Sequence, residues 1–331
     1  PRPERVLEPS AGDGAFLRGL AAHPLGARVA EVLAIEPDAA EAALARASLA
    51  FTGEVRVASA LGGALDGLAP VDLAVGNPPF VRYQFVGAAD RAGAAALGAR
   101  LGEPLGGVAN LWIPVLLAAL ERLAPGGAFA FVVPAELFTG VSAGAARRWL
   151  LAWTDRLSAE LVAPGAFAGA LQEVVVLAGV RRATARAGGA PLAMHEPGVG
   201  TWEWAAEPAT TTWMPALLPV GAAAAWEQAR ALPAVRRLGD VARFEVAIVT
   251  GANGFFSVDD GLVAAHGLGP WARPLLPRIR HAPGLRFGAD EHAALAAAGL
   301  PARLLHFAAG EPDPRGVAGP AAYLAAGEAA G

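Results

Sequence analysis

Short apolar runs rich in valine, isoleucine and leucine alternate with alanine-rich stretches through the first 180 residues. The apolar runs have the length of strands, and the alanine-rich stretches between them, such as 38–49 and 111–123, have the length of helices. This alternation predicts an α/β fold with a mostly parallel sheet covered by helices. The predicted strands are seven in number, over 5–8, 32–36, 55–58, 71–76, 128–133, 159–163 and 173–179.

The composition changes after residue 183, where tryptophans, prolines and threonines interrupt the alternation. A chain of 331 residues is long enough for two domains. We predict a first domain over 1–182, a linker over 183–229, a smaller mixed α/β domain over 230–315 and a flexible tail over 316–331.

The composition also excludes several classes of protein. The net charge of −4 argues against a protein that coats nucleic acid nonspecifically. The chain has no cysteine and its six histidines are scattered, so we expect neither a disulfide framework nor a metal site. The apolar runs fall short of the ~18 residues of a membrane span, and no leader is visible, so we expect a cytoplasmic protein without membrane partners. Because the first residue is proline, we also expect an upstream segment to be missing.

A glycine-containing turn follows the first predicted strand. Gly12 and Gly14 lack a Cβ, so the backbone can bend tightly and a ligand can approach closely. A dinucleotide fingerprint would have a third glycine where Leu17 stands, which disfavours a pyrophosphate ligand. A ligand with sulfonium and ammonium charges would instead meet carboxylates, and Glu8 and Asp13 supply them.

The second predicted strand ends in Glu36, roughly 20 residues beyond the turn. At this separation an acidic side chain can accept hydrogen bonds from both hydroxyls of a ribose. A solvated carboxylate at a strand end is the alternative, and the glycine turn before it favours the ribose.

The tetrapeptide Asn77-Pro78-Pro79-Phe80 follows the fourth predicted strand, at the carboxyl edge of the sheet. An aromatic amine is a poor nucleophile because its lone pair is delocalised into the ring. The Asn77 side-chain oxygen and the Pro78 carbonyl can each accept one amine hydrogen and hold the nitrogen in line with a sulfonium methyl. Two successive prolines fix the direction of that carbonyl, and Phe80 offers a flat face on which an extruded base can stack. A plain turn with an aromatic plug is the alternative.

Three segments, in this order, resemble the amino-methylating DNA methyltransferases of restriction-modification systems: Glu-Pro-Ser-Ala-Gly-Asp-Gly-Ala-Phe-Leu at 8–17, Ile-Glu-Pro-Asp at 35–38 and Gly-Asn-Pro-Pro-Phe at 76–80. The resemblance covers 4–180 well and 250–256 more loosely. It implies a Rossmann-like class I methyltransferase domain, S-adenosylmethionine as cofactor and a target-recognition domain in the second half. The implied substrate is the amino group of adenine in double-stranded DNA, and a restriction or accessory subunit is left open as a further partner.

The resemblance also implies the site residues. The implied catalytic residues are Asn77, Pro78 and Phe80. The implied cofactor-binding residues are Glu8, Ser10, Gly12, Asp13, Gly14, Phe16, Glu36, Pro37, Ser59 and Asn77.

Two features depart from the family. An acidic residue usually follows the third strand, near the cofactor adenine, and this chain has Ser59 there, which predicts reduced cofactor affinity. The family also carries a cofactor-contacting segment upstream of the glycine turn, which this chain is expected to lack. An inert DNA-binding relative is therefore one alternative. A protein glutamine amide methyltransferase is another, although those enzymes end soon after the catalytic domain and about 150 residues follow it here.

The second half of the chain is locally basic. Between residues 230 and 286 there are eight arginines and four carboxylates. Because arginine contacts phosphates and guanine edges, we predict DNA contacts from Arg273, Arg278, Arg280 and Arg286. An ordinary solvated surface is the alternative for each of them, and the sequence leaves the choice between an adenine and a cytosine amine open.

Overall fold

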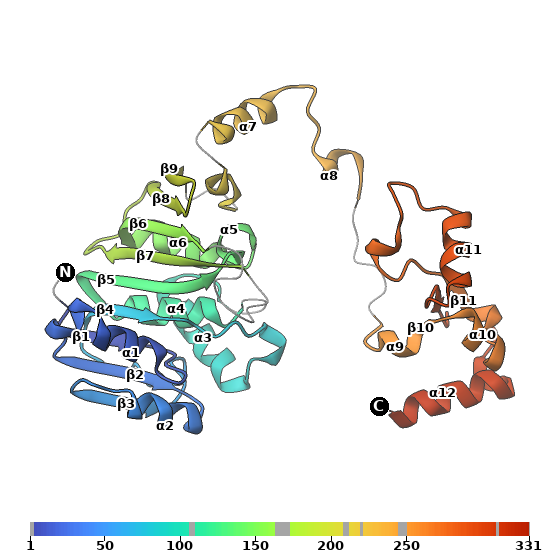
Figure 1. The fold of residues 1–331 in the computed structure, drawn as a ribbon, viewed down its shortest axis with the longest axis horizontal. Coiled ribbons are helices and arrows are strands. Elements are labelled where there is room, and N and C mark those ends of the chain that lie inside the picture. Colours follow the sequence, from blue (N-terminus) through green and yellow to red (C-terminus); the bar gives the residue numbers. More distant parts are fainter. Residues whose placement is uncertain are drawn as a thin grey trace. The chain divides into compact units, whose positions relative to one another are not determined.

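A computed structural model describes residues 3–105, 110–162, 173–207, 212–218, 221–243, 250–308 and 311–330 (Figure 1). The chain forms two compact units, Pro1–Val235 and Arg236–Gly331. Within the described ranges, every helix is too short or too polar to cross a membrane.

A nine-stranded sheet is the framework of the first unit. Its strands are β1 (Arg5–Glu8), β2 (Glu31–Glu36), β3 (Gly53–Val57), β4 (Val71–Gly76), β5 (Leu123–Pro134), β6 (Thr154–Leu161), β7 (Val174–Arg181), β8 (Ala190–Glu196) and β9 (Gly200–Ala206). The order is β3-β2-β1-β4-β5-β7-β6-β8-β9, and the strands from β3 to β5 are parallel. The chain order reverses between β1 and β4, so loops that follow these two strands flank a crevice at the carboxyl edge of the sheet.

Helices cover both faces of this sheet. They are α1 (Ala15–Ala22), α2 (Ala39–Ala47), α3 (Ala88–Leu101), α4 (Trp112–Glu121), α5 (Glu136–Thr139) and α6 (Gly144–Trp153), and α7 (Ala222–Ala231) follows β9. Side chains alternate between faces along a strand, so Val6 of β1 packs with α1 and α2, whereas the adjacent Leu7 packs in the larger core with α4 and α6. The α4 helix is buried along nearly its whole length because it is apolar on all sides.

Part of the face that carries α1 is open. A cavity of about 510 Å³ lies there, and its lining includes Phe16 and Leu20 of α1, Leu73 and Val75 of β4 and Ala130 of β5. The β4 and β5 residues are only half-buried, in contrast to Phe131 on the opposite face of β5. The sheet is therefore packed on both sides mainly from β3 to β1.

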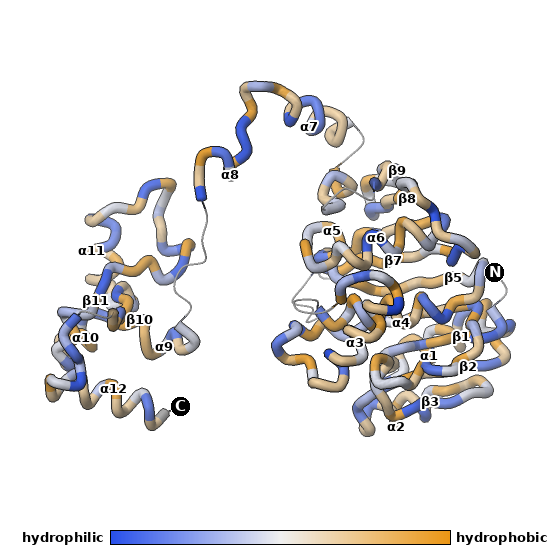
Figure 2. Tube along the Cα trace, turned by 180° about the vertical axis from the view of Figure 1, so that it is seen from behind, coloured by the Kyte–Doolittle hydropathy of each residue, from blue (hydrophilic) through white to orange (hydrophobic). Residues whose placement is uncertain are grey.

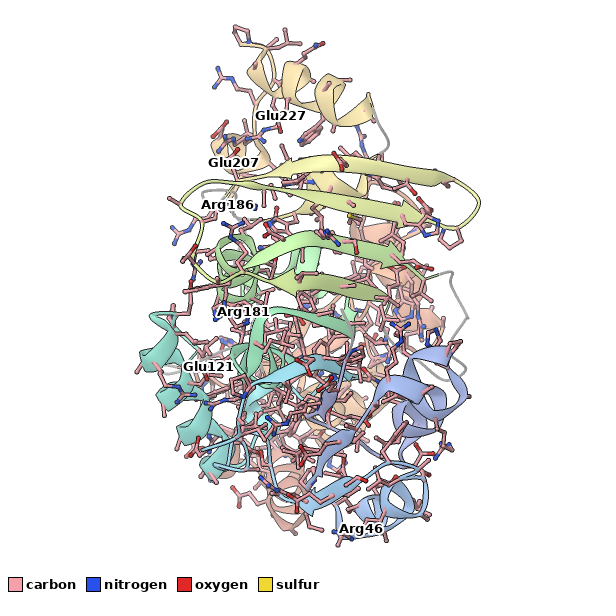
Figure 3. The ribbon with its side chains drawn as sticks, turned by 90° about the vertical axis from the view of Figure 1, so that its left-hand side faces the viewer. Arg46, Glu121, Arg181, Arg186, Glu207 and Glu227 are labelled. Carbon is pink, nitrogen blue, oxygen red and sulfur yellow. The ribbon has the colours of Figure 1, made fainter. Side chains whose placement is uncertain are left out.

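A cation–aromatic contact stabilises the edge of the sheet where β7 ends. The guanidinium carbon of Arg181 lies 4.9 Å from the ring centroid of Trp149 and 4.3 Å from that of Trp153. Burial lowers the pKa of Arg181, and Glu121 lies on the same side of the molecule (Figure 3). Because β7 runs antiparallel to β5, this edge is opposite to the carboxyl ends of β1 and β4.

The second unit is built on a three-stranded antiparallel sheet with the order β10-β12-β11. Its elements are α8 (Leu238–Val241), α9 (Asn253–Phe256), β10 (Ser257–Val258), α10 (Asp260–His266), β11 (Ala272–Pro274), α11 (Ala289–Ala297), β12 (Arg303–Leu305) and α12 (Ala318–Ala330). The core is small, with Val258, Leu268 and Leu305 at its centre.

The predicted α/β fold with a mostly parallel sheet is confirmed. Each of the seven predicted strands is present, and β1 and β4 have the predicted bounds. Ala163, at the end of the sixth predicted strand, lies outside the described residues.

The predicted linker over 183–229 was wrong for its first half, because β8 and β9 extend the sheet there. β8 pairs with β6, and the buried Trp202 of β9 donates a hydrogen bond from Nε1 to the Ala216 carbonyl at 2.9 Å. The exposed stretch comes later, at α7 and α8, where Figure 2 shows hydrophilic and hydrophobic stretches in alternation. The boundary between the units accordingly lies at Val235, rather than at 182.

Most of the predicted flexible tail over 316–331 is helical. Residues 318–330 form α12, and Tyr323 holds this helix to α9. The Tyr323 hydroxyl donates to the Phe255 carbonyl at 2.6 Å, and the two rings are stacked with their centroids 4.7 Å apart. Tyr323 also lies against the ring of His266, with centroids 5.2 Å apart, and Glu328 of the helix pairs with Arg315. These are tertiary contacts, so an alanine-rich composition did not reveal the helix.

Candidate active site

Glu8 ends β1 directly before the glycine turn and is fully buried. Neither carboxyl oxygen of Glu8 has a hydrogen-bond partner within the described ranges. Burial, with smaller effects from the charges of Asp13 and Glu36, raises the pKa of Glu8 to about 8. The side chain is therefore mostly a neutral acid at pH 7, and a cation placed beside it would favour the carboxylate.

The glycine turn is fastened to the end of β2. The amide nitrogen of Gly12 donates to Oε2 of Glu36 at 2.9 Å, and the amide of Asp38 donates to Oε1 at 2.9 Å. Gly12 has a φ of +53°, and a Cβ there would meet no atom within 4 Å, so the space above the turn is open. Gly14 has a φ of +85°, and its Cβ would lie 2.9 Å from Cα of Ala45, so this position requires glycine.

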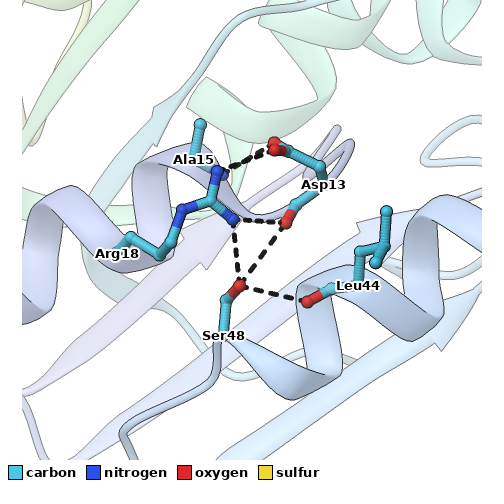
Figure 4. Close-up of polar contacts among 5 residues, drawn as sticks. All are labelled: Asp13, Ala15, Arg18, Leu44 and Ser48. Carbon is cyan, nitrogen blue, oxygen red and sulfur yellow. Dashed lines mark hydrogen bonds and ion pairs between the residues drawn. The ribbon is translucent and has the colours of Figure 1, made fainter.

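Asp13 is engaged within the fold rather than turned to a free site (Figure 4). Its Oδ2 accepts a hydrogen bond from Arg18 at 2.7 Å, and Arg18 also donates to the Asp13 carbonyl at 2.7 Å and to Ser48 Oγ at 3.0 Å. The hydrogen bond from Arg18 lowers the pKa of Asp13. Of the two carboxylates predicted in the turn, only Glu8 is left without a partner in the described part of the chain.

The tetrapeptide after β4 lies against the same turn. Ser10 Oγ donates a hydrogen bond to the Asn77 carbonyl at 3.1 Å, which joins the two loops. Pro78 is buried, and Phe80 is half-buried against the main core. The Asn77 side chain is exposed and makes no hydrogen bond to any described residue. Its amide oxygen is therefore available to a ligand.

A carboxylate that the sequence analysis missed stands beside Ser59. Ser59 follows β3, and its Oγ donates to Oδ1 of Asp90 at 2.5 Å while accepting from the Leu61 amide at 3.2 Å. Asp90 lies in the first turn of α3, the helix that follows the tetrapeptide. An acidic residue at the start of that helix was the available signal, but only the tertiary structure brings it to the end of β3.

Two of the predicted cofactor-binding residues, Phe16 and Pro37, have apolar side chains, which form no hydrogen bond to the other predicted site residues in the described part of the chain. Phe16 lines the cavity on the α1 face of the sheet, and Pro37 is exposed beside Glu36. Within the described ranges, no three carboxylate or imidazole side chains gather as they would around a metal ion.

The predicted DNA-binding arginines fall into two groups. Arg273 is bonded to Glu311 and donates to the Pro270 carbonyl at 2.7 Å, so it is occupied inside the second unit. Arg278, Arg280 and Arg286 are exposed, and their side chains make no hydrogen bond or ion pair within the described residues.

Comparison with known proteins finds a family match in the second half of the chain. Residues 210–331 match the C-terminal domain of the type II methyltransferase M.Eco57I. The predicted resemblance to restriction-modification methyltransferases is thereby confirmed, in a part of the chain that the resemblance covered only loosely. No curated protein matches the chain.

Several solved structures are similar. The type IIG restriction endonuclease BpuSI matches with a TM-score of 0.50 and 16% identity, over 91% of this chain and 40% of its own. A protein described as a class I S-adenosylmethionine-dependent methyltransferase from Listeria monocytogenes matches with a TM-score of 0.47 and 16% identity, over 58% of both chains. A type I methyltransferase subunit from Streptococcus thermophilus matches with a TM-score of 0.45 and 17% identity, over 57% of this chain and 42% of its own. The chain thus spans about half the length of these proteins, and the match to BpuSI shows a shared fold.

Proposed function

We propose that this chain transfers a methyl group from S-adenosylmethionine to the exocyclic amino group of adenine in DNA. One observation carries the proposal: the unpartnered buried Glu8, the acceptor Glu36 and the Asn77-Pro78 peptide converge at one edge of the sheet. The match of 210–331 to part of a type II methyltransferase supports a nucleic-acid substrate.

The residues at this edge suit a cofactor with a positive charge and a ribose. Glu8 is a buried acid that lacks any partner in the described chain, and the space over Gly12 is open to a ligand. Each Glu36 oxygen accepts one backbone amide and retains a lone pair for a ribose hydroxyl. Asp90, held by Ser59, supplies a carboxylate close to the end of β3, at the position where the chain itself has Ser59. The bound cofactor would supply the electrophilic methyl group.

The tetrapeptide would position the nucleophile. Oδ1 of Asn77 and the carbonyl oxygen of Pro78 would each accept one hydrogen of the amine, which directs the nitrogen lone pair at the methyl carbon. The buried Pro78 holds its carbonyl in place. The proton left on the nitrogen after transfer can pass to water, since the protonated product is a strong acid. No side chain has to serve as a strong base.

The base must leave the helix to reach this edge, because its amine is paired inside a duplex. Phe80, the last residue of the tetrapeptide, is half-buried, and its exposed part would stack on the extruded base. A restriction or accessory subunit remains a prediction from the resemblance.

The test is methylation by the purified chain with isotopically labelled S-adenosylmethionine and unmethylated plasmid DNA. Digestion to nucleosides and mass spectrometry should show label in N6-methyladenine. Label in N4-methylcytosine would reassign the base, whereas label only in protein glutamine, or no label at all, would refute the proposal.

Asn77→Ala provides the matched test of mechanism. Loss of one positioned acceptor should lower the methylation rate about 100-fold or more. Cofactor affinity should change little, because only the amine loses its contact. Gln84→Ala, which removes an exposed amide seven residues along the chain, should keep the wild-type rate. An Asn77→Ala variant with the wild-type rate would remove the tetrapeptide from the mechanism.

A further inference from the structure

The arginines between 250 and 330 are divided by their partners. Three are bonded to carboxylates inside the second unit: Arg273 to Glu311, Arg303 to Asp260 and Arg315 to Glu328. The other three are exposed, have no partner within the described residues, and all lie between β11 and α11: Arg278, Arg280 and Arg286. The unit therefore uses half of these arginines to stabilise itself and leaves the rest on one loop, residues 275–288.

The loop itself contains no carboxylate. The sequence has no aspartate or glutamate between Asp260 and Asp290. In a chain with a net charge of −4, this makes the loop a local excess of positive charge. Unpaired arginines concentrated in this way complement a polyanion.

The same loop exposes two aliphatic side chains. Ile279 is 84% exposed and Leu285 is 109% exposed, the two highest values among the large hydrophobic residues that the structure describes in this unit. Ile279 stands between Arg278 and Arg280, and Leu285 directly precedes Arg286. Burial of such exposed aliphatic side chains against a partner would favour binding of that partner.

Both ends of the loop are held by hydrogen bonds to the rest of the second unit. The Leu275 amide donates to the Ala302 carbonyl at 2.9 Å, and the Gly288 amide donates to Oε2 of Glu291 at 2.8 Å. The Phe287 ring meets His292 edge-on with centroids 6.3 Å apart. Two prolines, at 277 and 283, further restrict the backbone between these anchors.

We propose that this loop enters a groove of duplex DNA, with its three free arginines on phosphates and with Leu285 and Ile279 inserted between stacked bases. The choice of DNA as the polyanion rests on the proposed function. Duplex DNA places phosphates beside the faces of stacked bases, and apolar side chains inserted there unstack and kink it. Unstacking by the loop would also make extrusion of the target base easier, because part of the free energy needed to extrude a base is spent on breaking its stacking contacts. Arg273 takes no part, since Glu311 holds it.

Insertion between bases can be measured without knowledge of the recognition sequence. The full chain is bound to closed circular plasmid, the DNA is relaxed with topoisomerase I, and the linking number is read on a gel. Wild type should shift the topoisomer distribution, because a wedged side chain unwinds the duplex. Leu285→Ala and Ile279→Ala should lose at least half of that shift at equal occupancy. Val317→Ala, which truncates a residue 50% exposed outside the loop, should retain it.

The arginines are tested by the dependence of plasmid affinity on salt. Each phosphate contact contributes a slope of about −0.9 in log affinity against log salt, so the triple glutamine variant of Arg278, Arg280 and Arg286 should lose a slope of about 2.7. Between 50 and 200 mM salt this removes about 40-fold of the wild-type loss of affinity. Arg315→Gln, which breaks an internal ion pair, should keep the wild-type slope.

The outcomes separate the two proposals. If loop variants match wild type in linking number and salt slope while methylation continues, the loop assignment is overturned and the proposed function stands. If wild type neither binds nor methylates DNA, both fall. Unchanged far-ultraviolet circular dichroism of each variant shows that the second unit, which contains all the substituted residues, is folded.

Discussion

Glu8→Gln should stabilise the protein without cofactor at alkaline pH and weaken its affinity for the cofactor. The folded pKa of about 8 lies above the ordinary value of 4.5. Between these values the folded chain keeps a proton that the unfolded chain has lost, so wild-type stability falls as pH rises from about 4.5 to 8. Glutamine has the same shape and does not ionise, so the variant avoids this loss.

The size of the effect follows from the two pKa values. Each pKa unit corresponds to 1.36 kcal/mol, so ionising Glu8 in its buried position lowers the free energy of unfolding by about 5 kcal/mol above pH 8. This is comparable with the whole stability of an ordinary domain. The variant should match wild type near pH 4.5 and exceed it by up to this amount at pH 9.

Urea unfolding at pH 5, 7 and 9 measures the difference, with tryptophan fluorescence as the signal. Seven of the eight tryptophans belong to the first unit, all except Trp271, so the signal reports mainly on the unit that contains Glu8. Glu41→Gln, an exposed carboxylate of α2, is the control and should follow wild type. If wild type and Glu8→Gln change stability in parallel with pH, Glu8 is not a buried neutral acid.

Calorimetry of cofactor binding gives the complementary result. Binding beside a positive charge requires Glu8 to lose its proton, so wild-type affinity should rise close to tenfold per pH unit between pH 5.5 and 6.5. This range lies more than one unit below the pKa of an α-amino group, about 7.7, so the ligand stays protonated. The Glu8→Gln variant should bind more weakly with no such rise, and a pH-independent wild type would contradict the assignment.

Two further substitutions test the turn and the missed carboxylate. Gly14→Ala should destabilise the first unit by at least about 1–3 kcal/mol, because the backbone is left-handed there and the new Cβ would lie 2.9 Å from Ala45 Cα; Gly19→Ala, which meets nothing within 4 Å, should be neutral or stabilising in thermal unfolding. Asp90→Asn should weaken cofactor affinity about tenfold or more, because a charged acceptor is lost beside Ser59. An unchanged dissociation constant for Asp90→Asn would place this residue outside the site.

Much of the sheet could be predicted from the sequence. The apolar runs at β1 and β4 were predicted with their bounds, because a buried parallel strand is a continuous run of apolar residues. The order of turn, acid and tetrapeptide also predicts that Glu36 and Asn77 lie at the same edge of the sheet, since parallel strands end at a shared edge. The hydrogen bond from Ser10 to the Asn77 carbonyl now joins two of these loops.

Pairing between distant residues lay beyond the sequence, because which partners meet depends on the whole fold. Arg18 takes up Asp13 and leaves Glu8 alone, although both acids stand in the same turn. Asp90 reaches Ser59 across 31 positions of the chain.

The sequence by itself determined the local elements, the residue types at the sheet edge and the basic character of the second half. Only the tertiary structure decided which of the charged groups are satisfied. An arginine such as Arg273 and one such as Arg286 read alike in the chain, yet one is neutralised by Glu311 and the other is free of any described partner. Burial and pairing are properties of the folded chain, and they set both the pKa of Glu8 and the number of unpaired arginines on the loop.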